Sequence, residues 1–301
     1  MKEKILNPDH SEVKALTNER PYPAVLVLAG NDPSGGAGLS ADLLTLASLG
    51  CHPLPVVTAI TVQDSATLDD FLVMEPDWVV DQARMVLEDM PVEAFKVGMI
   101  GSVENVAAIT ELVSDYPDVP LVLDPVLASG SGSPMADDDL VAAMRDMLLP
   151  QVSVLTPNSL EARRLAVNDP DGDDDPDLDE CARRLLALGP AYVLITGTHE
   201  GSADVVNVLY GPEGRIREDR WPRLPGSYHS SGCTLASALT AFLAQGVEIG
   251  EAVREAQAYT YQTLAHAFRP GMGQFIPDRL FWSRDEAEPE NPEEDAGAEP
   301  E

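Results

Sequence analysis

Basic residues are scarce in this chain of 301 residues, and lysine is the scarcest of them. The sequence holds 19 lysines and arginines against 51 aspartates and glutamates, which gives a formal net charge of −32. The only lysines are Lys2, Lys4, Lys14 and Lys96. A surface with this excess of negative charge repels phosphate backbones and anionic lipids. The composition therefore excludes a general binder of nucleic acid or of anionic membranes.

Cysteines and long apolar runs are also few. Cys51, Cys181 and Cys233 are odd in number and far apart, so they offer neither a disulfide framework nor a zinc-binding spacing. This usage favours a reducing cytosol. No apolar run approaches the length of a membrane span, and the first 20 residues lack the apolar stretch of a secretory signal. We therefore expect a cytoplasmic protein.

The two ends differ in composition from the part between them. Residues 1–20 are polar with mixed charge, and residues 285–301 carry nine acidic side chains and no basic one. Segments that combine high charge with few apolar residues do not fold by themselves. We expect a flexible N-terminal arm over 1–20, a folded domain over 21–284 and a disordered acidic tail over 285–301.

Short apolar runs alternate with helical patterns through the expected domain. Buried strands are predicted at 24–29, 55–60, 94–99, 121–124, 152–155 and 192–195. Helices are predicted at 39–49, 77–90, 103–113, 137–148, 159–166 and 178–188, followed by a hairpin around 211–214 and two closing helices. This alternation indicates an α/β fold with a mainly parallel central sheet flanked by helices. Active residues are then expected after the carboxyl ends of the strands.

A turn of small residues over 228–233 leads directly into a helical run at 234–244 and places Cys233 at the junction. A helix N-terminus offers unpaired N–H groups and the positive end of a dipole, so this turn is suited to hold an anion. A cysteine there is expected to have a lowered pKa and to act as a base or nucleophile. A capped helix with a half-buried thiol is the plain alternative. His229 could pair with Cys233, but the intervening turn argues against a shared face.

A glycine-rich loop follows the first predicted strand. Residues 36–41 fit the pattern G-x-G-x-x-A between a strand and a helix, which is typical of dinucleotide binding. No acidic residue follows at the spacing that this pattern requires, and the Gly-Lys-Ser/Thr of a P-loop is absent. A loop on which a small planar ligand lies against the backbone is an equal alternative.

Polar side chains follow two other predicted strands. Asn158 and Glu161 are three residues apart and share a face of the first helical turn, where an amide and a carboxylate can hold a hydrated Mg²⁺. The alternative is an N-cap with a capping-box glutamate. The amide of Gln63 can donate to and accept from a heteroaromatic ring.

Taken together, these motifs resemble one family. Residues 30–38, 41–42, 57–63, 96–99, 123–126, 156–158, 161–162 and 231–235 occur in the order found in the hydroxymethylpyrimidine/phosphomethylpyrimidine kinases of thiamine synthesis. The resemblance covers roughly 23–280. It implies a ribokinase-like three-layer α/β fold that uses ATP and Mg²⁺. It also implies phosphorylation of 4-amino-5-hydroxymethyl-2-methylpyrimidine, then of its monophosphate to the diphosphate, and it suggests a homodimer.

The resemblance also assigns roles to individual residues. The pyrimidine pocket would consist of Gln63, Asp42, Gly30, Ala37, Met99 and Val126. Cys233 would be the catalytic base, and the backbone N–H groups of Ser231, Gly232 and Cys233 would form the anion hole. ATP would contact Asn158, Glu161 and Thr196, and the metal ion would lie at Glu161 and Asp124.

The chain departs from the family pattern at charged and at tightly packed positions. The family usually has Gly-Thr-Gly-Cys where this chain has Ser-Ser-Gly-Cys at 230–233. Family lysines are missing at Thr196, near 129–132 and at Met272. Two alternatives therefore stay open: a pyridoxal or pyridoxine kinase on the same scaffold, and a pyrimidine-binding protein without kinase activity.

Overall fold

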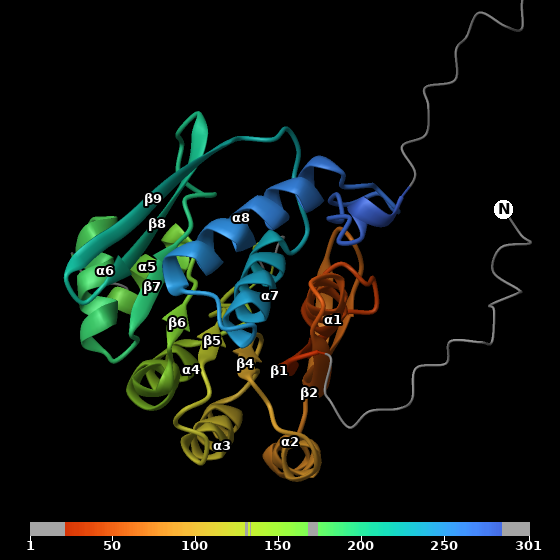
Figure 1. The fold of residues 1–301 in the computed structure, drawn as a ribbon, viewed down its shortest axis with the longest axis vertical. Coiled ribbons are helices and arrows are strands. Elements are labelled where there is room, and N and C mark those ends of the chain that lie inside the picture. Colours follow the sequence, from red (N-terminus) through yellow and green to blue (C-terminus); the bar gives the residue numbers. More distant parts are fainter. Residues whose placement is uncertain (1–21, 130–131, 133, 168–173, 285–301) are drawn as a thin grey trace, which may run out of the picture.

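A nine-stranded sheet with helices on both faces forms the centre of the protein (Figure 1). The structure is a computed structural model that describes residues 22–129, 132, 134–167 and 174–284. The arm expected over 1–20 and the tail expected over 285–301 lie outside these described residues. The sheet order is β3-β2-β1-β4-β5-β6-β7-β8-β9.

The strands fall into a parallel centre and antiparallel edges. Their bounds are β1 (Ala24–Asn31), β2 (His52–Gln63), β3 (Leu68–Val73), β4 (Ala94–Val97), β5 (Leu121–Leu123), β6 (Val154–Leu155), β7 (Tyr192–Ile195), β8 (Asp204–Gly211) and β9 (Gly214–Pro222). From β2 through β1 and β4 to β7 all neighbours pair in parallel. The pairs β2–β3, β7–β8 and β8–β9 are antiparallel. The mainly parallel sheet and the hairpin around 211–214 are thus confirmed.

One strand, β3, was not predicted, and β2 is longer than expected. The sequence of β3 is Leu-Asp-Asp-Phe-Leu-Val, and none of its six residues is buried. Aspartate is disfavoured in strands, and an edge strand without a buried face shows no clear alternation. The hydrophobic pattern therefore contained no signal for it.

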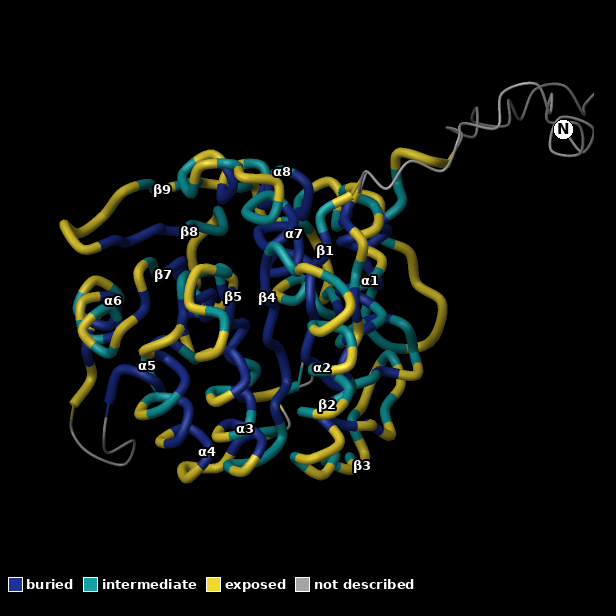
Figure 2. The backbone as a smooth tube through the Cα atoms, turned by 60° about the horizontal axis from the view of Figure 1, so that its bottom comes forward, coloured by how far each residue is buried: buried dark blue, intermediate teal, exposed yellow. Residues whose placement is uncertain are grey.

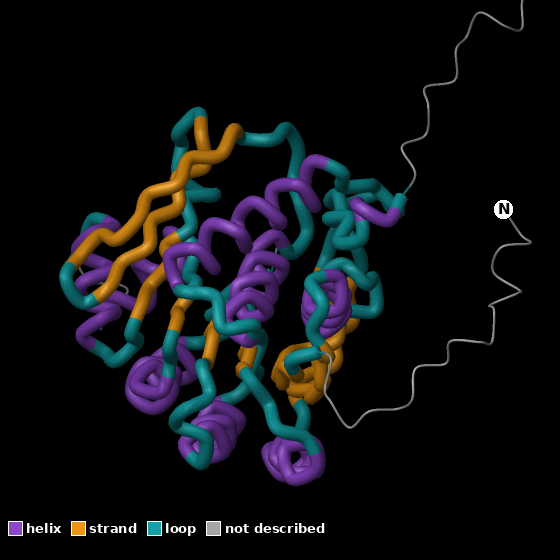
Figure 3. The backbone as a smooth tube through the Cα atoms, in the orientation of Figure 1, coloured by secondary structure: helices purple, strands orange, loops and turns teal. Residues whose placement is uncertain are grey.

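The helices form two layers, one on each face of the sheet (Figures 1 and 3). On one face lie α1 (Gly38–Ser48), α7 (Ser231–Ala244) and α8 (Ile249–Ala265). On the other lie α2 (Pro76–Asp89), α3 (Val103–Ser114), α4 (Asp138–Ala143), α5 (Ser159–Ala166) and α6 (Leu178–Ala187). The helix expected over 137–148 is α4 followed by a π-helical segment, Met144–Leu148. No helix within the described ranges is both long and apolar enough to cross a membrane.

The central strands are buried on both faces. In β1, Leu26 and Leu28 pack toward α2 and α3, whereas Val25 and Val27 pack toward α1. All four are 0% exposed, and Figure 2 shows the middle of the sheet as a continuous buried region. Because successive side chains alternate between the two covered faces, such a strand reads as an unbroken apolar run.

A buried ion pair connects the sheet to the helices on one face. Lys96 on β4 is the one lysine among the described residues, and it is 0% exposed. Its Nζ donates to Oδ2 of Asp42 on α1 at 3.0 Å, and the other oxygen of that carboxylate accepts from Ser237 Oγ on α7 at 2.7 Å. Burial favours the neutral amine, but the Asp42 carboxylate, Cys233 and Asp124 together outweigh burial and raise the pKa of Lys96. The network thus fixes α1 and α7 relative to β4.

We predict that Lys96→Met lowers the free energy of unfolding by about 3–5 kcal/mol, because the substitution leaves a buried carboxylate without its cation. Urea unfolding followed by circular dichroism measures the loss. The double variant Lys96→Met/Asp42→Asn should recover a large part of it, since the pair is then removed on both sides. A single variant as stable as the unmodified protein would contradict the stabilising role of this pair.

Candidate active site

The first turn of α7 presents free backbone donors. The first helical bond runs from Thr234 N to Ser230 O at 3.2 Å. The N–H groups of Ser231, Gly232 and Cys233 have no backbone acceptor among the described residues. Three such donors at the positive end of a 14-residue helix form a place for an anion.

The carboxylate of Asp124 faces this helix terminus from the end of β5. A Cβ atom on Gly232 would lie 3.8 Å from Asp124 Oδ1. Asp124 is 5% exposed, and its Oδ2 has no hydrogen-bond partner in the described part of the chain. Lys96 Nζ lies 4.0 Å from that oxygen. Burial raises the pKa of Asp124, and Lys96 opposes the rise. An orphaned carboxylate oxygen in this position fits a cation.

The thiol of Cys233 lies between these groups. The prediction that its pKa is lowered is wrong. Burial, and then the carboxylate of Asp124, raise the pKa of Cys233 to about 12, although Lys96 acts in the opposite direction. The helix N-terminus predicted the reverse. That prediction considered the helix alone, whereas the fold partly buries the residue and adds a carboxylate from the end of β5.

Asn158 and Glu161 form the capping box that was the plain alternative for them. Asn158 Oδ1 accepts from Leu160 N at 2.9 Å and from Glu161 N at 3.0 Å, and Glu161 Oε2 accepts from Asn158 N at 2.9 Å. Burial, and then Asp124, raise the pKa of Glu161 to about 8. Two neighbouring carboxyl groups with raised pKa values mark a functional site.

Asp124 and Glu161 offer two carboxylates to a metal ion, which is fewer than the three or four protein ligands of a zinc site. No group of three or more histidine, cysteine or acidic side chains suited to a metal is found among the described residues. Mg²⁺ keeps several waters and needs only one or two carboxylates. The donor set, with its unpartnered Asp124 Oδ2, therefore fits Mg²⁺ better than a zinc-type site.

Thr196 lies beside Asn158 at the end of the neighbouring strand. The two residues form an isolated parallel bridge, and Thr196 N donates to Pro157 O at 2.9 Å. This position follows β7, so it shares the carboxyl edge of the sheet with Asp124 after β5. The fold thus brings the residues expected to contact ATP to one edge.

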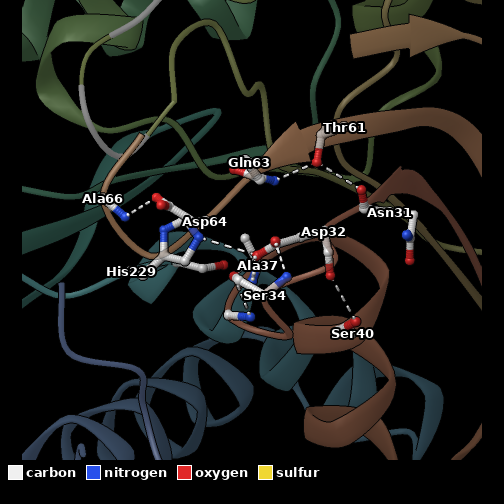
Figure 4. A network of polar contacts seen from close by, with 12 residues as sticks. Asn31, Asp32, Ser34, Ala37, Ser40, Thr61, Gln63, Asp64, Ala66 and His229 are labelled. Atoms are coloured by element: carbon white, nitrogen blue, oxygen red, sulfur yellow. Dashed lines mark hydrogen bonds and ion pairs between the residues drawn. The ribbon is translucent and has the colours of Figure 1, made fainter. Parts of the chain in front are cut away.

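Of the residues expected around the pyrimidine, Gly30 and Met99 lie close together at the same edge of the sheet. A Cβ atom on Gly30 would lie 3.0 Å from Met99 Sδ, so a larger residue at position 30 would collide with the residue that follows β4. Val126 is partly exposed two residues after Asp124. Gln63 Nε2 donates to Thr61 Oγ1 at 2.8 Å, as Figure 4 shows.

Asp42 does not belong to this group, and its expected place in the pocket is corrected. The residue is 0% exposed. Both carboxylate oxygens have partners, Lys96 Nζ and Ser237 Oγ. The side chain points from α1 toward α7 and β4, beneath the site. Asp42 therefore connects α1 with β4 and α7 in the core below the site.

The glycine-rich loop is held by a residue that the sequence analysis did not single out, Asp32. Its carboxylate, 2% exposed, accepts from Ser34 N at 2.8 Å and from Ala37 N at 2.7 Å, and so closes the loop (Figure 4). His229 Nε2 lies 3.2 Å from Asp32 Oδ2. The histidine therefore pairs with the loop rather than with Cys233. An aspartate two residues before a serine is a turn signal that could have identified Asp32.

Comparisons with known proteins identify the family of the chain. The family model described as phosphomethylpyrimidine kinase matches residues 32–278. The hydroxymethylpyrimidine/phosphomethylpyrimidine kinase of Streptomyces coelicolor is 38% identical over 258 residues, which cover 83% of this chain and 92% of that protein.

Two solved structures resemble the fold. The phosphomethylpyrimidine kinase of Clostridium difficile superposes with a TM-score of 0.68 at 33% identity, covering 80% of this chain and 99% of that one. The pyridoxal kinase of Staphylococcus aureus, in complex with AMP-PCP and pyridoxal, has a TM-score of 0.78 at 28% identity and covers 87% and 95%. The fold is that of the ribokinase-like small-molecule kinases. Within that class, the chain belongs to the phosphomethylpyrimidine kinase family and is a phosphotransferase that acts in thiamine biosynthesis.

We predict that Glu161→Gln stabilises the metal-free protein more at pH 9 than at pH 5.5. A folded-state pKa of about 8, above the ordinary value of 4.5, means that Glu161 costs stability as the pH rises from about 4.5 through 8. Thermal unfolding in EDTA measures this, at roughly 2–4 °C for each kcal/mol. Glutamine keeps an oxygen for the bond from Asn158 N. The same difference in melting temperature between the variant and the unmodified protein at both pH values would contradict the raised pKa.

Proposed function

We propose that this kinase transfers the γ-phosphoryl group of ATP to the hydroxyl of 4-amino-5-hydroxymethyl-2-methylpyrimidine and then phosphorylates the monophosphate to the diphosphate. The observation that carries this proposal is the meeting of three free N–H groups, Cys233 and Asp124 at one point of the sheet edge. Phosphoryl transfer depends on positioning and on charge stabilisation more than on covalent chemistry. This arrangement supplies both.

In this proposal, the backbone of 231–233 receives the moving phosphoryl group, and Cys233 accepts the proton of the substrate hydroxyl. The raised pKa of Cys233 is due partly to the Asp124 carboxylate. Pairing of that carboxylate with a cation removes this cause and makes the thiolate easier to form. Asp124 and Glu161 would hold Mg²⁺, which supplies positive charge to the phosphates of ATP.

The pyrimidine would lie between the glycine-rich loop and the end of β4. Gly30 and Met99 form the floor, Ala37 and Val126 lie beside it, and the amide of Gln63 reads the ring. Gln63 is partly exposed, and within the described ranges its side chain bonds only through Nε2 to Thr61 Oγ1, which leaves the carbonyl oxygen able to turn toward a ligand. Asn158 and Thr196, which lie side by side, would flank the nucleotide.

Buried cations can replace part of the charge of the missing lysines. Besides Lys96, the guanidinium of Arg279 lies behind the site with only 2% of the residue exposed. It donates to Gly36 O at 2.7 Å and to Thr234 Oγ1 at 3.1 Å, and so links the glycine-rich loop to α7. No carboxylate within salt-bridge distance pairs with it among the described residues. Its charge is therefore available to the anion hole through the protein interior.

A pyridoxal kinase is the second candidate, and the fold similarity to the enzyme of Staphylococcus aureus favours it. Both substrates are small aromatic rings that carry a hydroxymethyl group. Turnover of the pyrimidine and of pyridoxal under the same conditions separates the two. A preference for pyridoxal would overturn the proposed substrate.

We predict that the protein, incubated with Mg·ATP and the hydroxymethylpyrimidine, adds one and then two phosphoryl groups, as read by mass spectrometry. Cys233→Ala should lower the rate by roughly 10²–10⁴-fold, as is typical for loss of a general base, while pyrimidine binding persists. Cys181→Ala is the matched control, because this fully buried cysteine lies on α6, on the opposite face of the sheet. Pyrimidine binding without turnover in the unmodified protein would favour a non-catalytic binder.

A further inference from the structure

Each arginine of β9 pairs with a carboxylate, whereas the next arginine along the chain does not. Arg215 Nη2 lies 2.7 Å from Asp179 Oδ2, and Arg220 Nη2 lies 2.6 Å from Glu218 Oε1. Arg223 directly follows β9 and is exposed. Its hydrogen bonds within the described ranges all go to carbonyl oxygens, and no carboxylate there lies within salt-bridge distance of it. In a chain with a net charge of −32, this cation is left for another anion.

The three acceptors of Arg223 belong to one loop, which connects β7 with β8. Nη1 donates to Thr198 O at 2.8 Å, Nη2 to Glu200 O at 2.9 Å, and Nε to Ser202 O at 3.2 Å. A guanidinium group has five N–H groups, so two are not used by these bonds. Carbonyl oxygens carry no formal charge, so the cation is held in a fixed orientation without being neutralised. A pre-oriented arginine loses less side-chain freedom when it binds a ligand.

The loop held by Arg223 begins at the residues proposed to flank the nucleotide. Thr196, the first residue after β7, forms the isolated bridge with Asn158. Arg163 Nη1 on α5 lies 2.9 Å from Glu200 Oε1, so the carboxylate of this loop is directed to α5 and not to Arg223. From Arg223 the chain crosses to the first turn of α7 with its free N–H groups (Figure 1). The guanidinium therefore lies at the carboxyl edge of the sheet, beside the proposed nucleotide position.

We propose that Arg223 binds the phosphates of the nucleotide. The two N–H groups that the loop does not use donate to phosphate oxygens, while the three carbonyl oxygens keep the guanidinium in place. Arginine suits this task because its planar group can present two parallel N–H donors to a phosphate. This inference rests on the proposed function for the position of the nucleotide beside Asn158 and Thr196.

The test measures binding of Mg·AMP-PCP to the full-length protein by isothermal titration calorimetry, at low and at high KCl concentration. Arg223→Met removes the charge together with the bonds to the loop, whereas Arg223→Lys keeps the charge. Arg220→Met is the matched control, because it removes the same charge from an exposed arginine of β9 that has a carboxylate partner.

We expect Arg223→Met to raise the Kd for Mg·AMP-PCP by about tenfold at low salt, as is typical for loss of a hydrogen bond to a charged group. Arg223→Lys should recover part of this loss, and Arg220→Met should bind as the unmodified protein does. The difference between Arg223→Met and the unmodified protein should shrink at high salt, because exposed charges are screened. In turnover, the KM for ATP should rise in Arg223→Met with little change in kcat.

Three results would overturn the inference. Equal Kd values for Arg223→Met and the unmodified protein would show that this arginine does not meet the phosphates. The same weakening in Arg220→Met would assign the effect to the overall charge of the surface. Equal weakening in Arg223→Met and Arg223→Lys that does not change with salt would assign it to the structure of the loop.

The calorimetric test separates this inference from the proposed function, because it needs neither the pyrimidine nor turnover. A protein that does not phosphorylate the pyrimidine could still bind Mg·AMP-PCP through Arg223, and in that case the proposed function fails while the role of Arg223 holds. Pyrimidine turnover with an unchanged Kd in Arg223→Met would give the opposite result.

Discussion

The ion pair between Lys96 and Asp42 is the interaction on which the site depends. A charged amine in the middle of a parallel sheet is tolerated only because a carboxylate meets it, and that carboxylate also bonds to Ser237 on α7. The pair therefore fixes the helix whose first turn carries the free N–H groups and Cys233. It is also the reason that a positive charge lies within 4.0 Å of Asp124. The ion pair between Lys96 and Asp42 therefore determines both the position of α7 and the charge next to Asp124.

The arrangement of charge around the site is the reverse of what the bulk composition suggests. The chain as a whole is strongly acidic, yet the cations nearest Cys233 and Asp124 are Lys96 and Arg279, which approach from the protein interior. Surface lysines would be hydrated and would be screened by salt, whereas buried cations are neither. Burial raises the pKa values of Asp124 and Glu161, so the charged forms of both carboxyl groups are disfavoured in the absence of a cation. Binding of a cation would stabilise these charged forms.

The sequence contained most of the fold because the central strands are buried on both faces and appear as unbroken apolar runs, as in residues 24–29. It also predicted the carboxyl edge of the sheet, where Asp124, Asn158 and Thr196 gather. It could not predict β3, whose residues lack a buried face. Two predictions at the site were wrong for a related reason. The resemblance placed Asp42 in the pocket, and the pKa of Cys233 was judged from its own helix, whereas Lys96 and Asp124 reach these residues from distant strands. Contacts between residues far apart in the chain carry no local pattern, so the pairing of Lys96 with Asp42 and of His229 with Asp32 appears only in the folded protein.

The burial of Lys96 has a practical consequence for handling the protein. The other lysines are at positions 2, 4 and 14. Reagents that acylate amines, such as succinimidyl ester dyes, biotin labels and activated resins, should attach within the first 14 residues, because the remaining amine is 0% exposed. Conjugates would then be attached through this one short segment, outside the described residues, and Lys96 within the sheet would remain unmodified.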